Sequence, residues 1–207
     1  MDSALTPDTY GRRLAQFYGF YAPLEAALKT RCGMPEGRMQ EPLSCLAALF
    51  PRLNKSRLLR QDLLYLQINA DSLPLCRDLP PLQTQPQVLG CVYVLEGATL
   101  GGRVITQHVQ ATLGITAATG GSFFEGYAGD TARMWQTMRQ TLLSGAVDTR
   151  SENAMVASAI ATFACLRGYC AAAGVQAISN DGGNAGSGVT NGPGRPPANH
   201  ERKEQRA

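Results

Sequence analysis

Hydrophobic positions recur at steps of three and four residues along most of the chain, which is typical of helices that bury one face. Thr6-Pro7-Asp8 combines a capping hydroxyl with a proline, and this combination favours the beginning of a helix. The apolar residues that follow share one broad face: Tyr10, Leu14, Phe17, Phe20, Tyr21, Leu24 and Leu28. We therefore predict a long first helix here, with a kink at Pro23.

The same periodicity predicts five further helices. They span Pro42 to Phe50, Lys55 to Ile68, Gln87 to Leu113, Ala128 to Leu143 and Ser151 to Ala173. The stretch from Leu73 to Pro86 contains four prolines and is predicted to be a connection, and Gly114 to Gly121 is predicted to be a turn. No segment shows the alternation of a half-buried strand, so we predict an all-α fold, a compact helical bundle.

A change in composition marks the end of the predicted bundle. Residues 174–207 are dominated by Gly, Pro and Asn, with almost no large apolar side chain. Such a segment cannot bury enough surface to offset the entropy lost on ordering. We expect one helical domain over residues 1–173 and a loose tail over 174–207.

Composition and charge exclude several classes of protein. A chain of 207 residues, 44% hydrophobic and 17% charged, is ordinary for one globular domain. The net charge of +3 comes from scattered basic residues, so we expect no nucleic-acid partner. The longest apolar runs are shorter than the roughly 18 residues of a membrane span, and the N-terminus does not resemble a secretory signal. We therefore expect a cytoplasmic protein with no membrane contact.

The cysteines favour neither a disulfide framework nor a zinc site. Six cysteines lie at irregular spacings without a C-x-x-C pair, and the chain has two histidines. We interpret the cysteines as reduced thiols that fill the core, and we expect no resident metal site.

The segment Tyr93 to Gly102, with the sequence YVLEGATLGG, carries the strongest functional signal. Each glycine inside a helix costs about 1 kcal/mol relative to alanine, so something must compensate. Gly97 and Gly101 are four residues apart and leave one face of the helix without side chains. Two interpretations remain open from spacing alone: a close contact or kink between helices, or a flat ligand lying against the helix backbone.

YVLEGATLGG, followed by Arg103-Val104-Ile105, resembles the distal-helix motif of the bacterial heme oxygenases that produce biliverdin. Upstream, the spacing Tyr10-x-x-x-Leu14-x-x-Phe17-Tyr18-x-x-Tyr21 resembles an earlier helical segment of that family. Downstream, Phe123-Phe124-x-Gly126-Tyr127 and Thr162-Phe163 follow in the order of the family. The resemblance covers Leu5 to Cys170 and implies a heme oxygenase-like helical bundle.

The resemblance implies that heme is both substrate and cofactor, held between a proximal helix with an iron-ligating histidine and a distal helix whose glycines admit the porphyrin. The implied heme contacts are Tyr93, Gly97, Ala98, Gly101, Gly102 and Phe163; the alternative for the two aromatic residues is plain core. The implied reaction uses O2 and electrons from a ferredoxin or an NAD(P)H-dependent reductase. It yields biliverdin, carbon monoxide and ferrous iron, with a phytochrome as a candidate recipient and no side-chain nucleophile.

One departure from the family concerns the proximal histidine. Family members begin with a helix of the form Leu-Arg-x-x-Thr-x-x-x-His, whereas no histidine precedes His108 here. His108 lies about 10 Å beyond Gly101 along the helix, on the wrong side of the heme, and His200 falls in the expected tail. We expect Met1 to be an internal methionine of a longer protein that carries the proximal helix. The alternative is a non-catalytic heme oxygenase-like binding module that has lost the axial ligand.

Several charged and aromatic residues are weaker candidates. Glu96 and Arg103 are expected to pair along their own helix, or else to orient water near the heme. Arginine suits the heme propionates, although each of Arg12, Arg13 and Arg167 is also typical of the surface. Trp135 and Tyr127 are expected to be structural.

Overall fold

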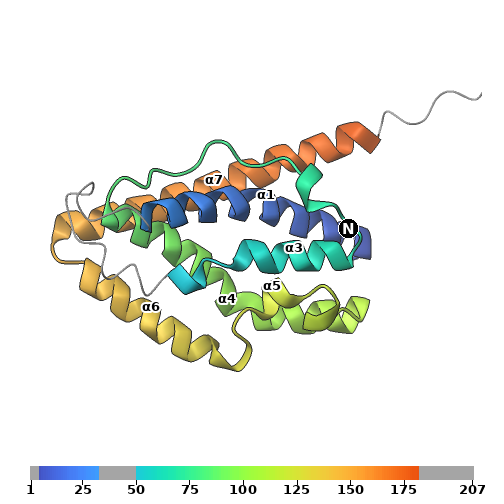
Figure 1. Cartoon of the computed structure of the whole chain (residues 1–207), viewed down its shortest axis with the longest axis horizontal. Helices are drawn as coiled ribbons and strands as arrows, with labels where there is room; N and C mark the ends of the chain where they lie inside the picture. Colours follow the sequence, from blue (N-terminus) through green and yellow to red (C-terminus); the bar gives the residue numbers. More distant parts are fainter. Residues whose placement is uncertain (1–4, 33–49, 182–207) are drawn as a thin grey trace, which may run out of the picture.

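A computed structural model describes residues 5–32 and 50–181, and this part of the chain is helical with no strand (Figure 1). The all-α prediction is therefore confirmed. The helices are α1 (Pro7–Cys32), α3 (Lys55–Tyr65), α4 (Gln85–Leu113), α5 (Ser122–Glu125), α6 (Thr131–Gly145) and α7 (Thr149–Asp181). Short 3-10 turns are η2 (Phe50–Arg52), η3 (Ala70–Ser72), η4 (Ala117–Thr119) and η5 (Ala128–Asp130).

Helix α4 is the central element of the bundle, because it packs against α5, α6 and α7. α1 packs against α3 and α7, and α3 packs against α5. α4 and α7 start at the same end of the molecule and then diverge, with α1 and α3 lying over the gap between them (Figure 1). The largest fully buried apolar side chains are Leu14, Phe20, Leu24, Leu28, Leu59, Leu63, Leu89, Leu95 and Met138.

Local sequence signals explain where the helices begin and end. The Thr6 hydroxyl accepts a hydrogen bond from the Thr9 N–H at 3.2 Å, and α1 begins at Pro7 as predicted. The Thr84 hydroxyl and the Gln87 side chain form a capping box, so α4 begins at Gln85, two residues before the predicted start. α4 ends at Leu113, and the next residue, Gly114, has a left-handed φ of 69° that suits glycine.

The structure also differs from the predicted boundaries at other places. α3 ends at Tyr65 instead of Ile68, because the chain turns at Gln67 with a φ of 61°. The four-residue helix α5 has too few residues to show a periodic pattern and was not predicted. α7 continues to Asp181, beyond the predicted end at Ala173. Residues 182–207 lie outside the described residues. The helix predicted over Pro42 to Phe50 also lies outside them, except for Phe50, which belongs to η2.

A close approach between α4 and α7 occurs at Gly90. A Cβ atom at this position would lie 2.2 Å from the Met155 carbonyl oxygen, so only glycine fits the contact. The Ser158 hydroxyl donates a 2.6 Å hydrogen bond to the Gln87 carbonyl one turn earlier in α4. The N-terminal part of α4 is thereby fixed against α7.

Two buried carboxylates accept hydrogen bonds from the N-terminal N–H groups of neighbouring helices. Glu25 of α1 accepts hydrogen bonds from the backbone N–H groups of Lys55 at 2.8 Å and Ser56 at 3.1 Å, at the start of α3. Asp62 of α3 does the same for α5, accepting from the N–H groups of Ser122 at 2.9 Å and Phe123 at 2.8 Å. These carboxylates satisfy donors that a helix leaves unpaired at its first turn. Burial raises the pKa of Asp62, and the hydrogen bonds from Phe123 and Ser122 oppose that increase.

Two helices of the described chain are long and apolar enough to cross a membrane by length and composition alone. They are α4, whose most apolar window is 56% buried in the bundle, and α7, for which the figure is 17%. This is a weak indication of a membrane protein, since a core helix such as α4 passes the same test. The low burial of α7 means that it presents apolar side chains at the surface.

We expect Asp62→Asn to lower the free energy of unfolding by about 2 kcal/mol, because the new amide NH2 cannot accept from the Phe123 N–H. Thermal and urea unfolding followed by circular dichroism measure this loss. Asp71→Asn is the control: Asp71 is exposed and pairs with Arg60 at the surface, so its substitution should change stability little. Equal effects of the two substitutions would contradict the assigned role of Asp62.

Candidate functional site

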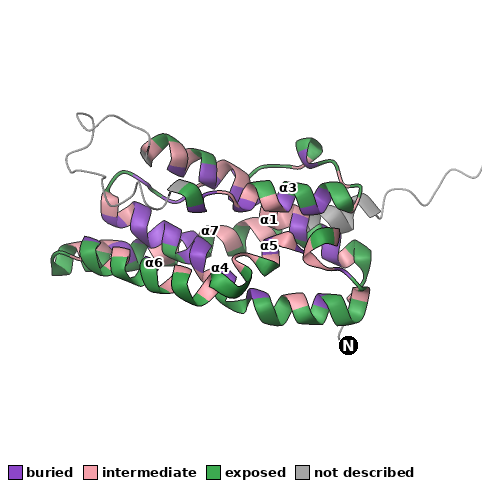
Figure 2. Cartoon of the chain, turned by 60° about the horizontal axis from the view of Figure 1, so that its bottom comes forward, coloured by how far each residue is buried: buried purple, intermediate pink, exposed green. Residues whose placement is uncertain are grey.

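One face of α4 is open at the glycines of the motif. Among the described residues, a Cβ atom added at Gly97 or at Gly101 meets no neighbouring atom within 4 Å. Figure 2 shows α4 largely buried in its N-terminal half and largely exposed in its C-terminal half, and the two glycines lie near the middle of the helix. We call the surface formed by Tyr93, Gly97, Leu100, Gly101 and Val104 the glycine face. A flat molecule can reach the helix backbone there without meeting a side chain at either glycine.

Gly102 faces a different side of the helix. A Cβ atom at Gly102 would lie 2.0 Å from the Phe124 carbonyl oxygen, so this glycine allows α4 to pack closely against α5. Ala98 is exposed. Of the glycines that the sequence proposes as heme contacts, Gly101 is therefore exposed, Gly97 is half-buried with open space where a Cβ atom would lie, and Gly102 serves packing.

Large apolar side chains on α4 and α7 remain exposed. Tyr93 is 39% exposed, and its ring lies 5.8 Å from the ring of Trp135 in α6. Phe163 of α7 is 54% exposed and follows Val156 and Ile160, also exposed, at helical spacing. Neither Tyr93 nor Phe163 is a core residue. Both helices present apolar surface that an apolar ligand or partner would cover.

Glu96, directly before Gly97, is buried at 2% exposure, and its carboxylate accepts hydrogen bonds from three side chains. The Arg52 guanidinium lies 3.1 Å from one carboxylate oxygen, the Lys55 ammonium donates to the other, and the Tyr127 hydroxyl donates at 2.9 Å. We call Glu96, Arg52, Lys55 and Tyr127 the anchor cluster. The expected pairing of Glu96 with Arg103 is wrong: Glu96 points into the protein, whereas Arg103 is exposed.

Further contacts join the anchor cluster to its surroundings. Arg52 also donates to the Met134 carbonyl of α6 at 3.0 Å, and the Lys55 ammonium lies 5.2 Å from the centre of the Tyr127 ring. Burial and the Glu96 carboxylate raise the pKa of Tyr127 above its usual value, so its hydroxyl stays protonated and donates. The two cations and the hydroxyl together offset the desolvation of the Glu96 charge.

Sequence reasoning missed Arg52, Lys55 and the partner role of Tyr127. Arg52 and Lys55 lie more than 40 residues before Glu96, in and just after a short 3-10 turn that has no periodic pattern. The available signal was Glu96 itself, an acidic residue inside an apolar run, because a buried carboxylate requires cationic or donor partners. The expectation that Tyr127 is structural agrees with its hydrogen bond to Glu96.

The three arginines proposed for heme propionates lie on α1 and α7, away from α4. Arg12 pairs with Asp8 at 2.5 Å, and Arg13 donates to Gln16 at 3.1 Å. Arg167 is exposed. None of them lies on the helix that carries the glycine face.

The histidines and cysteines form no metal cluster in the described residues. His108 is exposed on α4, and His200 lies outside the described residues. Within the described chain, Cys76, Cys91, Cys165 and Cys170 are free thiols. Burial raises the pKa of the Cys91 thiol to about 12, which makes it a poor nucleophile at neutral pH.

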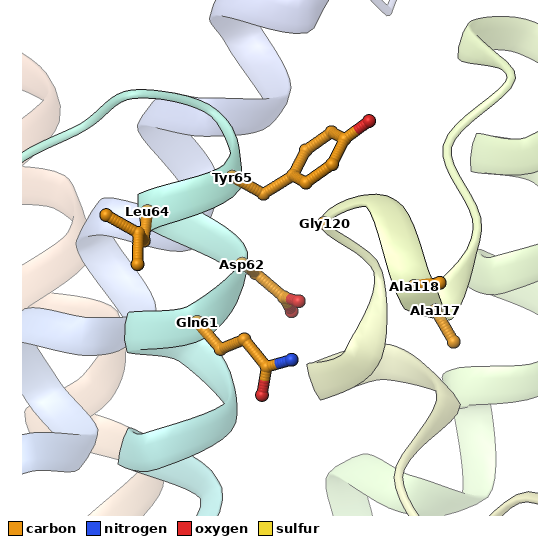
Figure 3. Close-up of a pocket in the computed structure, with 7 residues that line it drawn as sticks. All are labelled: Gln61, Asp62, Leu64, Tyr65, Ala117, Ala118 and Gly120. Atoms are coloured by element: carbon orange, nitrogen blue, oxygen red, sulfur yellow. The ribbon is translucent and has the colours of Figure 1, made fainter.

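A small pocket of about 240 Å³ lies between α3 and η4 (Figure 3). Its lining includes Gln61, Asp62, Tyr65 and Gly120, and none of the residues of the glycine face. The Asp62 carboxylate at its edge is already bonded to Ser122 and Phe123. The pocket therefore offers no free charged group to a ligand.

The fold and the glycine face define an all-α protein with a long central helix that is anchored on one side and open on the other. The sequence profile of heme oxygenase matches residues 1–170. The chain therefore belongs to the heme oxygenase family, as the resemblance of the motif predicts. No curated protein matches the chain.

We expect Gly101→Ala to raise the free energy of unfolding by up to about 1 kcal/mol, because the new methyl group meets no neighbour and alanine favours the helix. Gly102→Ala should lower it by about 2 kcal/mol, since its methyl group collides with α5. Chemical unfolding of the two variants in parallel measures the difference. A destabilising Gly101→Ala would show that the glycine face is closed in solution.

Proposed function

We propose that the chain binds heme against the glycine face and takes part in its oxidative cleavage to biliverdin, carbon monoxide and ferrous iron. The single observation that carries this proposal is the open space at Gly97 and Gly101, in a helix whose other glycines, Gly90 and Gly102, are closely packed. Glycine in an exposed helical stretch costs stability, and no helix contact within the described residues compensates at these two positions. A ligand that needs the backbone would compensate.

The residues around the opening suit a porphyrin. Gly97 and Gly101 let a flat ring approach the helix backbone, and a larger side chain at either position would stand where the ring lies. The exposed Tyr93, Leu100 and Val104 offer apolar surface on the same helix, and Phe163 offers it on α7. Apolar side chains of this kind exclude water from the reacting ring.

Heme supplies the redox chemistry when it is bound, with O2 and electrons from a ferredoxin or an NAD(P)H-dependent reductase. The chain's own contribution is binding, orientation and exclusion of water, and we assign no side chain as a general acid or base. We place the reaction in the cytoplasm, with a phytochrome as a candidate recipient of the product.

A second candidate function is a non-catalytic heme-binding module. The observation in its favour is the position of His108, which is exposed on α4 itself and about 10 Å along the axis from Gly101. A histidine on the helix of the glycine face cannot ligate iron from the opposite side of the heme. The two functions differ in whether the bound heme is turned over once an axial ligand is supplied.

The deciding experiment is a hemin titration of the 207-residue chain with and without imidazole, followed by addition of ascorbate. Imidazole can occupy an open axial position on the iron. Saturable binding followed by loss of the Soret band and formation of a bile pigment supports heme cleavage. Saturable binding without ring cleavage in the presence of imidazole supports the binding module, and the absence of saturable binding overturns both.

Gly101→Leu tests where the heme binds. We expect it to weaken hemin binding at least about tenfold, equivalent to ~1.4 kcal/mol, because the leucine fills the space above the backbone. Gly168→Leu is the matched control, since Gly168 is an exposed helical glycine on α7 that also has no atom within 4 Å of an added Cβ. If both variants bind hemin as tightly as the wild type, the glycine face is not the heme site.

A further inference from the structure

The Glu96 side chain and the two glycines of the glycine face point away from α4 in different directions. Glu96 immediately precedes Gly97, and on an α-helix Glu96 and Gly101 point in directions about 140° apart. The Glu96 side chain is buried at 2% exposure, whereas Gly101 is exposed. A movement of α4 at Glu96 would therefore displace or rotate the glycine face directly.

Glu96 connects this turn to several elements that are distant in sequence. Arg52 belongs to η2, Lys55 is the first residue of α3, and Tyr127 lies between α5 and α6. The bond from Arg52 to the Met134 carbonyl extends the connection to α6. Every ion pair that α4 forms within the described residues involves Glu96.

The turn that follows Glu96 has few other side-chain anchors. Gly97 and Gly101 have no side chain, and Ala98 and Leu100 are exposed. Thr99 is buried, but its hydroxyl donates to the Glu96 carbonyl of the same helix at 2.6 Å, so this bond holds no neighbouring element. Apart from the packing of Gly102 on α5 and of the buried Thr99 side chain beside Gly126, the polar side-chain link between this turn and the described part of the bundle is the Glu96 carboxylate.

We infer that Glu96 is a positioning residue that sets the depth and rotation of the glycine face, and through it the placement of the bound heme. Arg52, Lys55 and Tyr127 act by holding the Glu96 carboxylate. The inference rests on the proposed function for its ligand. The anchoring of the helix can be measured without any ligand.

The test compares Glu96→Gln with Glu25→Gln by amide hydrogen exchange of the ligand-free protein and by hemin titration. Glu25 is also buried and also bonds to the start of α3, but it lies on α1. We expect both variants to lose stability. In Glu96→Gln alone, the amides of residues 97–105 should exchange at least about tenfold faster and hemin should bind about tenfold more weakly.

The outcomes separate the inference from the proposed function. Equal exchange rates in residues 97–105 for both variants, or unchanged hemin affinity in Glu96→Gln, overturn the positioning role. Failure of the wild type to bind hemin overturns the proposed function, and the placement of heme by Glu96 falls with it, whatever the exchange data show. Faster exchange with weaker hemin binding, confined to Glu96→Gln, supports both.

If Glu96→Gln does not fold, Tyr127→Phe provides a milder test, because it removes one hydrogen bond to Glu96 without changing the charge. Its control is Tyr10→Phe, which removes the bond from a buried tyrosine hydroxyl to the Gly120 carbonyl at 2.9 Å. We expect the exchange of residues 97–105 to increase in Tyr127→Phe and to stay unchanged in Tyr10→Phe. No difference between these two variants overturns the inference.

Discussion

The buried carboxylate of Glu96 constrains the arrangement of this bundle more than any other polar group described. A buried charge that has lost its hydrating water needs opposite charges and hydrogen-bond donors around it, because otherwise the folded state loses several kcal/mol of stability. Arg52, Lys55 and Tyr127 meet it from three places in the chain. The central helix, the start of α3 and the connection before α6 can therefore take few relative positions.

The anchoring of α4 explains why its glycines serve different purposes. Gly90 and Gly102 lie where backbone from α7 and α5 comes too close for a Cβ atom, so they belong to the packing of the bundle. Gly97 and Gly101 lie where no other described residue comes within 4 Å of an added Cβ atom. The chain belongs to the heme oxygenase family, whose profile spans residues 1–170, and the proposed heme site uses this open pair. The ion pairs of Glu96 hold α4 in the bundle, so Gly97 and Gly101 need no packing contact of their own.

The uncovered apolar side chains extend beyond the glycine face. Val156, Ile160 and Phe163 lie along one exposed side of α7, which is far less buried than α4 although it is equally apolar. In the family that the sequence resembles, heme is held between two helices, and one of them carries the ligating histidine. In the proposed function α4 is the distal helix, and the one histidine of the described residues, His108, lies on that same helix.

The sequence by itself determined the helical class, most helix positions and the segment that carries the candidate site. These features follow from local rules: apolar periodicity for α1, the helix start at Thr6-Pro7-Asp8, and the spacing of Gly97 and Gly101. Only the tertiary structure decided which glycines are open, because that depends on atoms of Met155 and Phe124, which come from other helices. It also decided the partners of Glu96, which lie across the fold. Spacing along a helix shows which residues share a face, but the neighbours of that face are set by the packing of the whole chain.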